Sequence, residues 1–393
     1  MSTAPEIVVC AAARTPIGRF LGTLAGTPAP RLGALAIAGA LERAGLRPDQ
    51  AEEVLMGCVL GAGLGQAPAR QAALGAGLPA AVPATTLNKV CGSGMKAVML
   101  ACDALALGRA DVVVAGGMEN MSAAPFLVPT GRLGHKAGHV ALLDHLMKDG
   151  LEDAYEAGRA MGTFAEAMAQ RQGFTRAQQD AYAAESVRRA QQAREAGWFD
   201  AEIVPVLPAG GGEPLARDEI PARIDPAKIP RLKPAFANDG SITAASSSAN
   251  GDAAAALVLA TRASAARLGL PVLASVRAQA SVARAPADFT LAPIGAVRQV
   301  LQQARWHAQE VDLYEINEAF AVVAMAAMRE LELAHERVNV LGGACALGHP
   351  IGASGARVLV TLLNALRRRG ARRGVATLCI GGGEAVAMAL EAE

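Results

Sequence analysis

The stretch from Thr85 to Asn120, TTLNKVCGSGMKAVMLACDALALGRADVVVAGGMEN, decides the fold class of this chain. It opens with a short strand-like run that ends at Cys91. Apolar residues then recur at helical spacing, and Gly108 ends this predicted helix. From Asp111 a run of valines is apolar on both faces, as in a fully buried strand of a parallel sheet. A strand, a helix and a buried strand in succession indicate an α/β fold with a parallel or mixed sheet covered on both faces.

The same alternation continues on either side of this stretch. Residues 7–11 and the run from Val54 have the pattern of strands, and Leu32–Gly45 has the pattern of a helix stopped by glycine. In the last third of the chain, strands are predicted from Val272, at 313–316 and at 375–390, with helices at 319–331 and 354–370. The chain therefore consists largely of alternating strands and helices.

Between Met121 and Ala249 the sequence changes to proline, glycine, histidine and charged residues. Two amphipathic helices are predicted within this region. One covers 161–172, and the other begins behind a capping box formed by Thr175 and Gln178. This region is predicted to be an inserted or linking subdomain.

Two segments of the chain, one in each half, resemble each other. DVVVAGGMEN from Asp111 and VATLCIGGGEAV from Val375 are both predicted as buried strands that run into paired glycines and a glutamate. Such an internal repeat indicates two similar halves. We expect an N-terminal half at 1–121 and 250–271, an inserted loop domain at 122–249, and a C-terminal half at 272–393. The loops that follow corresponding strands would then meet at one crevice, where open α/β sheets bind ligands.

Composition excludes several classes of function. The net charge is +1 and aromatic residues make up 3% of the chain, which argues against nucleic-acid binding. Glycine and proline interrupt the longest charge-free stretches, so no membrane span is expected. The N-terminus has no basic, apolar leader, and we expect a cytoplasmic protein. The six cysteines lie far apart, without the spacing of a disulfide or zinc framework.

Cys91 is the first candidate for chemistry. It lies between a predicted strand and the first turn of a predicted helix, with Gly92 and Gly94 close by. A helix N-terminus stabilises a thiolate and can bind an oxyanion through its free N–H groups. The alternative is a buried, unreactive cysteine at the end of a strand.

Three further polar residues lie at comparable places. His349 stands in the irregular, glycine-rich turn of GGACALGHPIGASGAR, and a nucleophilic cysteine needs such a base. Cys379 ends a buried strand before three glycines, and Asn317 follows the predicted strand LYEI. Each signal is weak alone, but together they describe one crevice with two thiols, an imidazole, a carboxamide and several unobstructed amides.

The motifs CGSG, GGMENMS, NEAF, GHPIGASGAR and CIGGGEA, in this order and spacing, resemble those of the thiolases over essentially the whole chain. The resemblance implies a five-layered αβαβα core made of two βαβαβαββ halves, with a loop domain inserted in the first half. It also implies a CoA-dependent C-acyltransferase that joins two acetyl-CoA molecules into acetoacetyl-CoA, or reverses that reaction. Acyl-CoA is then the substrate and CoA a product, with no metal or other cofactor, in a homodimer or homotetramer.

The resemblance also implies a role for each matching residue. Cys91 is the nucleophile that carries the acyl group, and His349 receives its proton. Cys379 is the acid/base that removes the α-proton of acetyl-CoA. His349 and a water held by Asn317 bind the enolate oxygen, while the backbone amides of Cys91 and Gly381 bind the tetrahedral intermediate.

Three residues match positions that line the substrate site of the family. Ser248 matches a serine that contacts the pantetheine arm, Met161 lines the acyl pocket, and Phe320 forms a wall of that pocket. Many acetoacetyl-specific members carry a histidine directly before this methionine, whereas this chain has Ala160.

Other interpretations remain open beside this one. The chain could be a longer-chain 3-ketoacyl-CoA thiolase of β-oxidation, a non-catalytic acyl-CoA or lipid-binding member, or a structural partner in a β-oxidation complex. His135, His139 and His145 have ligand-like spacing but no cysteine or acidic motif beside them, which disfavours a metal site. GAGLGQ after the Val54 run resembles a dinucleotide turn but lacks the acidic residue that such a site requires about 20 positions later.

Overall fold

The computed structural model describes residues 5–393, and these residues form two halves of similar order. The N-terminal half contains β1 (Ile7–Arg14), α1 (Ala29–Ala44), β3 (Glu53–Gly57), α2 (Pro68–Gly75), β4 (Ala84–Leu87), α3 (Ser93–Ala106), β5 (Val112–Asn120) and β8 (Gly251–Thr261). The C-terminal half contains β9 (Ala274–Ala283), α7 (Ala292–Ala304), β10 (Leu313–Ile316), α8 (Ala321–Glu330), α9 (Ala344–Leu347), α10 (Ile351–Arg369), β11 (Arg373–Ile380) and β12 (Glu384–Ala392).

Hydrogen bonding joins the strands of both halves into one mixed sheet in the order β10-β11-β12-β9-β1-β8-β5-β3-β4. In each half the strands that follow a crossover helix pair in parallel, and the last strand returns antiparallel. The halves meet through β1 and β9, which share only two residue pairs. A short strand β2 (Gly18–Arg19) also pairs with β8.

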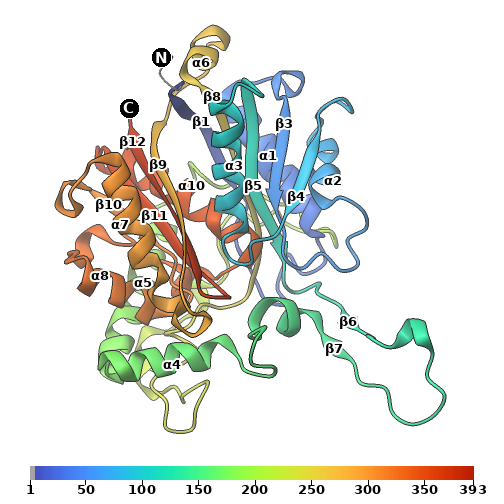
Figure 1. The fold of residues 1–393 in the computed structure, drawn as a ribbon, viewed down its shortest axis with the longest axis vertical. Helices are drawn as coiled ribbons and strands as arrows, with labels where there is room; N and C mark the ends of the chain where they lie inside the picture. The colour runs from blue at the N-terminus through green and yellow to red at the C-terminus, as the bar shows by residue number, and fades with distance from the viewer. Residues whose placement is uncertain (1–4) are drawn as a thin grey trace.

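The two halves enclose a central pair of helices. Helices α3 and α10 pack against each other and contact strands of both halves, while α1 and α2 cover the outer face of the N-terminal half and α7 covers that of the C-terminal half. Figure 1 shows the N-terminal half in blue and teal beside the C-terminal half in orange and red. This arrangement confirms the expected αβαβα layering.

Glycines let the central helices approach each other closely. A Cβ atom on Gly94 of α3 would lie 2.8 Å from the backbone nitrogen of Ala356, and one on Gly355 of α10 would lie 2.4 Å from that of Met95. Backbone atoms cannot withdraw as a side chain can, so both positions require glycine. The crossing holds the N-termini of α3 and α10 together.

The paired glycines of the two halves look alike in the sequence but play different roles in the structure. Gly116 and Gly117 lie inside β5, which continues to Asn120. A Cβ on Gly117 would lie 2.1 Å from the carbonyl oxygen of Gly352, so this glycine admits α10 rather than making a turn. In the C-terminal half, Gly382 and Gly383 have φ angles of +91° and +92° and turn the chain from β11 into β12.

The C-terminal half also departs from the pattern of the N-terminal half. Its third strand is reduced to a single parallel bridge between Tyr314 and Val338. Helix α10 begins at Ile351, three residues earlier than the pattern at Ser354 predicts. Pro350 precedes its first residue and accepts the first main-chain hydrogen bonds of the helix.

The region between β5 and β8 contains both predicted amphipathic helices. Helix α4 covers Met161–Gln172, and α5 covers Arg176–Glu195 behind a capping box in which Thr175 and Gln178 bond reciprocally. A two-stranded arm, β6 (Phe126–Leu127) and β7 (Leu143–Asp144), projects away from the body of the molecule (Figure 1). No helix among residues 5–393 is long and apolar enough to cross a membrane.

Candidate active site

Cys91 lies in the turn that leads from β4 to α3, two residues before that helix begins. The preceding Val90 has a φ angle of +47°, which is unfavourable for a β-branched residue. The side chain of Asn88 holds this conformation by accepting a 2.8 Å hydrogen bond from the backbone N–H of Val90. A strained, fixed backbone therefore presents the Cys91 thiol at the N-terminus of a central helix.

The surroundings of Cys91 keep it a neutral thiol at rest. Burial raises its pKa to about 11, and hydrogen bonding from the backbone amides of Gly381 and of Cys91 itself offsets part of this rise. Those two amides therefore face the sulfur. They are the pair expected to bind an oxyanion on a group attached to Cys91.

Cys379 lies next to the end of β11 and is buried. Burial raises the pKa of its thiol well above the usual value, and ionisation of the neighbouring Cys91 would raise it further. The two turns also pack directly, because a Cβ on Gly92 would lie 2.3 Å from the side chain of Ile380. The structure thus brings the two cysteines together from opposite halves of the chain.

His349 lies two residues before α10 begins, and its backbone N–H donates a 2.8 Å bond to the carbonyl of Ala249. Its Nδ1 lies 2.6 Å from the hydroxyl of Ser354, which in turn donates to the carbonyl of Pro350 at 2.9 Å. The hydroxyl is thereby left to accept, so Nδ1 carries the proton and Nε2 has a free lone pair. Among residues 5–393, Nε2 has no hydrogen-bond partner.

The same burial keeps His349 neutral. Removal from water lowers its pKa to about 3, and the nearby positive charge of Arg357 contributes in the same direction. A neutral imidazole with a free Nε2 can accept a proton from a thiol.

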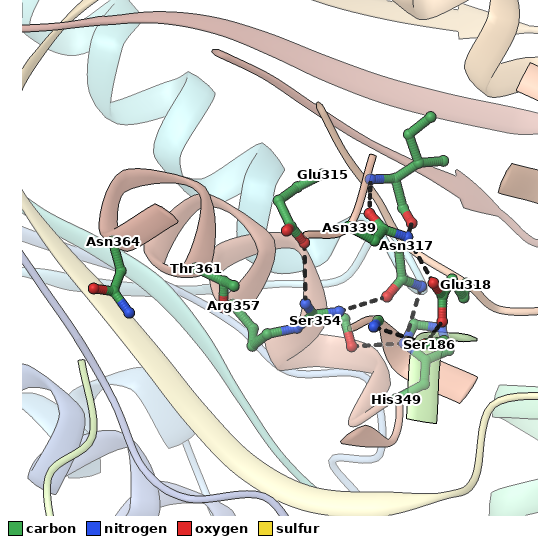
Figure 2. A network of polar contacts seen from close by, with 12 residues as sticks. Ser186, Glu315, Asn317, Glu318, Asn339, His349, Ser354, Arg357, Thr361 and Asn364 are labelled. Atoms are coloured by element: carbon green, nitrogen blue, oxygen red, sulfur yellow. Dashed lines mark hydrogen bonds and ion pairs between the residues drawn. The ribbon is translucent and has the colours of Figure 1, made fainter. Parts of the chain in front are cut away.

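Asn317 follows β10 and is buried, with its Nδ2 atom 3.4 Å from Nδ1 of His349. Its Oδ1 atom accepts a 2.9 Å hydrogen bond from Nη2 of Arg357. Figure 2 shows Asn317 between His349 and Arg357 in this polar network. The structure therefore places the carboxamide beside the imidazole, at the carboxyl end of a strand.

The three residues expected along the substrate lie beside the segments that carry the polar groups of the site. Ser248 donates both its backbone N–H and its hydroxyl to the carbonyl of Ala319, each at 3.0 Å. The ring of Phe320 packs edge-on against Phe236, with 5.8 Å between ring centroids. A Cβ on Gly381 would lie 3.7 Å from the terminal methyl of Met161. All three residues therefore lie beside segments that carry the polar groups.

The sequence interpretation left three residues of this region without a role. Glu119 of β5 is buried and accepts hydrogen bonds from the backbone amides of Val59, Leu60 and Gly352 at 3.1, 3.1 and 2.8 Å. Burial raises its pKa to about 7 despite these bonds. A glutamate within an otherwise apolar strand was the sequence signal for this position.

Ser354 and Arg357 are the other two. They lie three positions apart in the quoted motif GHPIGASGAR, and on a helix this spacing places both on one face. The spacing of Ser354 and Arg357 predicts that they share a helix face. The contact of Arg357 with Asn317, forty residues away in the chain, was not predictable from it.

The histidines of the arm do not gather around a common point. His145 pairs with Asp149 at 2.6 Å and accepts from the backbone N–H of Ala62, while Nε2 of His135 lies 3.0 Å from the carbonyl oxygen of Gly138. Among residues 5–393 there is no group of three or more histidine, cysteine or acidic residues with the geometry to hold a metal ion.

Comparison with known proteins agrees with this geometry. The family models of the thiolase N-terminal and C-terminal domains match residues 7–263 and 270–392. An acetyl-CoA acetyltransferase of Pseudomonas aeruginosa is 51% identical over 389 residues, covering 98% of this chain and 99% of that protein. One from Cupriavidus necator is 50% identical over 392 residues, covering 98% of this chain and 99% of that protein.

One solved structure is similar to this chain over almost the whole length of both. The Acat5 thiolase of Ascaris suum, determined in complex with coenzyme A, has a TM-score of 0.94 and 44% sequence identity. The match covers 99% of this chain and all of that one. Two domain models that together span nearly all described residues, and relatives at about half identity, lead to one conclusion. The chain belongs to the thiolase family.

Proposed function

We propose that this chain catalyses the reversible condensation of two acetyl-CoA molecules to acetoacetyl-CoA and CoA. The relatives named above are acetyl-CoA acetyltransferases, and one solved relative holds coenzyme A. The observation that carries the proposal is that the thiols of Cys91 and Cys379 lie close enough to interact electrostatically, while Nε2 of His349, next to the helix that packs on α3, has no hydrogen-bond partner among residues 5–393. Acyl transfer through one thiol and proton transfer through the other require this pair.

The first step is acyl transfer to Cys91. As the sulfur attacks the thioester carbonyl of acetyl-CoA, its proton passes to Nε2 of His349. The carbonyl oxygen becomes an oxyanion, which the amides of Cys91 and Gly381 stabilise. The carbon–sulfur bond to CoA then breaks, and the departing CoA sulfur takes a proton from Cys379, which starts as a neutral thiol. Acetylated Cys91, protonated His349 and a Cys379 thiolate remain.

The second step forms the carbon–carbon bond. The Cys379 thiolate removes an α-proton from a second acetyl-CoA. The enolate oxygen is stabilised by the Nε2–H group of His349 and by a water held by Asn317. The enolate carbon attacks the acetyl group on Cys91, and the bond to sulfur breaks. The Cys91 thiolate recovers its proton from His349, so every group returns to its initial state.

The surroundings of the site support a CoA thioester as the substrate. Ser248 and Phe320 lie on two segments that run side by side, joined by a bridge between Ser247 and Phe320. Together with Met161 they give the acyl group and the adjoining arm of CoA an apolar wall with few charges. No metal ion or redox cofactor takes part in the proposed steps.

A second enzymatic candidate is thiolysis of longer 3-ketoacyl-CoA substrates. Ala160, where a larger residue stands in many acetoacetyl-specific thiolases, favours it, while the names of the close relatives favour acetyl transfer. Turnover of acetoacetyl-CoA and of a medium-chain 3-ketoacyl-CoA with CoA, measured side by side, distinguishes the two. No turnover of either by the wild type would leave only a binding role.

The roles of the two cysteines are tested separately. Cys91→Ala is expected to abolish both acetylation and condensation, since nothing else can carry the acyl group. Cys379→Ser is expected to accept a labelled acetyl group from acetyl-CoA, detected by intact-protein mass spectrometry, but to condense poorly. Undiminished turnover by Cys91→Ala, or a Cys379→Ser enzyme that cannot be acetylated, would contradict this division of labour.

We also propose that the protein acts in the cytoplasm as a homo-oligomer. Two surfaces support the assembly. Strand β4 ends the sheet with one edge unpaired among the described residues, and the β6–β7 arm exposes apolar side chains such as Leu133.

A further inference from the structure

Arg357 is a charged residue in the interior that the proposed reaction does not use. It lies on α10, one of the two central helices, and only 1% of its surface is exposed. Transferring a guanidinium group from water into such a place is costly unless its donors are well paired. Its neighbours must therefore supply the contacts that stabilise the guanidinium in the interior.

Arg357 makes its shortest contact with Asn317 and not with the nearest carboxylate, Glu315. Oε2 of Glu315 lies 3.6 Å from Nη1, beyond hydrogen-bond distance, and neither Nη1 nor Nε has a hydrogen-bond partner among residues 5–393. Its one hydrogen bond runs from Nη2 to Oδ1 of Asn317, at 2.9 Å. Figure 2 shows Arg357 with Glu315 on one side and Asn317 on the other.

A purely structural ion pair would look different. Arginine and carboxylate groups that pair for stability adopt a two-pronged contact, which is short and uses both carboxylate oxygens. Arg14, an equally buried arginine, pairs in this way with Asp218 at 2.7 and 2.9 Å. Arg357 instead forgoes that contact with Glu315, and its best donor faces Asn317.

This bond fixes which end of the Asn317 carboxamide faces the reacting groups. The oxygen and nitrogen of an amide differ little in size, so an unrestrained carboxamide can turn over. A guanidinium has only donors. Rotation of Asn317 would set its NH2 group against Nη2, donor to donor, in a buried site. Oδ1 is therefore held toward Arg357, and Nδ2 is held on the side of His349, 3.4 Å from its Nδ1.

We propose that Arg357 is a positioning residue that holds the N–H edge of Asn317 on the side of His349, where Asn317 holds the water that stabilises the enolate oxygen. The inference rests on the proposed function, because it concerns the condensation step of that reaction. It predicts a specific pattern: loss of Arg357 impairs condensation, whereas acetylation of Cys91, which does not use Asn317, is largely preserved.

Two variants separate the hydrogen bond from the charge. Arg357→Met keeps most of the length of the side chain but has no donor, and Arg357→Gln restores an uncharged donor. Both are expected to fold. Burial raises the pKa of Glu315 to about 8 even beside Arg357, so this carboxyl is already mostly neutral at neutral pH. Removing the arginine therefore leaves no buried anion without a partner.

The experiment compares two rates in each variant: acetylation of Cys91 by acetyl-CoA, and kcat for condensation. We expect Arg357→Met to lower condensation about tenfold or more relative to acetylation, a smaller loss than removal of an oxyanion donor outright. Arg357→Gln should recover part of it. In an Asn317→Ala background, Arg357→Met should change condensation less than about twofold, because its target is gone.

Glu315→Gln is the matched control. It removes the possibility of an ion pair but leaves the bond from Arg357 to Asn317, so the ratio of the two rates should stay at the wild-type value. Equal loss of both rates in Arg357→Met, additivity with Asn317→Ala, or a changed ratio in Glu315→Gln would overturn the inference. A wild type that is neither acetylated nor condenses would instead overturn the proposed function.

Discussion

Cys91 and His349 are both neutral at rest, and this has a measurable consequence. Burial holds the pKa of the Cys91 thiol at about 11 and that of His349 at about 3. At neutral pH neither group is charged, so the thiolate exists only as the proton moves to His349 during attack. The free enzyme therefore differs from cysteine enzymes that rest as a thiolate and imidazolium pair.

Alkylation of Cys91 by iodoacetamide tests this state. Only the thiolate reacts, so the rate should rise roughly tenfold per pH unit between about pH 7 and pH 10, without a plateau. The rate is followed by mass spectrometry of the peptide that contains Cys91. The Cys379 peptide should react more slowly, because burial and ionisation of Cys91 both raise the pKa of that thiol. A plateau near pH 7 would show a resting thiolate instead.

The residues of the site divide into those that local sequence predicts and those it does not. Cys91, His349 and Cys379 became candidates because glycines and strand ends mark them, and these signals lie within a few positions of each residue. The bond from Arg357 to Asn317 depends on how α10 packs against β10. Such contacts arise from the packing of distant segments, so no local pattern reveals them.

At the scale of elements, helix boundaries with chemical signals were predicted well. Helix α4 has the expected bounds, and α5 begins at the predicted capping box. The sequence predicted a buried strand that includes Gly116 and Gly117, and strand β5 runs through both, but it did not show that Gly117 admits α10. Glycines that make turns and glycines that admit a neighbouring backbone look the same in one sequence. Only the position of α10 separates the two cases.

Gly355 and Gly295 provide a matched test of that distinction. A Cβ on Gly355 would lie 2.4 Å from the backbone nitrogen of Met95, so Gly355→Ala should lower the free energy of unfolding by about 1–3 kcal/mol. A Cβ on Gly295, within α7, would make only an ordinary 3.7 Å contact with Val282. Gly295→Ala should therefore be neutral or raise that free energy by up to about 1 kcal/mol.

Urea unfolding followed by circular dichroism measures both changes. Equal effects of the two substitutions would mean that α3 and α10 do not cross as closely as described. A larger loss in Gly295→Ala than in Gly355→Ala would contradict the account of both helices.

At the scale of the whole molecule, the site exists because two similar halves face each other. The N-terminal half supplies Cys91, and the C-terminal half supplies His349, Asn317 and Cys379. The inserted region adds Met161 and Ser248 along the expected path of the substrate. Each half alone would lack either the proposed nucleophile or its proposed proton acceptor, so in the proposed reaction the central crossing of α3 and α10 serves chemistry as well as stability.

The β6–β7 arm is expected to take part in assembly of the protein. Its exposed apolar side chains include Phe126, Leu133 and Leu142, which are 65%, 91% and 58% exposed. Apolar side chains gathered on a projecting segment are costly in water and are covered in an assembly. We therefore expect light scattering after gel filtration to show a homo-oligomer, and Leu133→Gln with Leu142→Gln to lower its mass.

The control for this prediction is Leu107→Gln. This position is 67% exposed, but it directly follows α3 in the chain and lies outside the arm. The substitution should leave the mass unchanged, because a lone apolar residue on a surface needs no partner. Both variants should keep the acetylation rate of Cys91, since the arm holds none of the proposed catalytic groups. A wild type that is monomeric at micromolar concentration, or an equal loss of mass in the control, would contradict assembly through the arm.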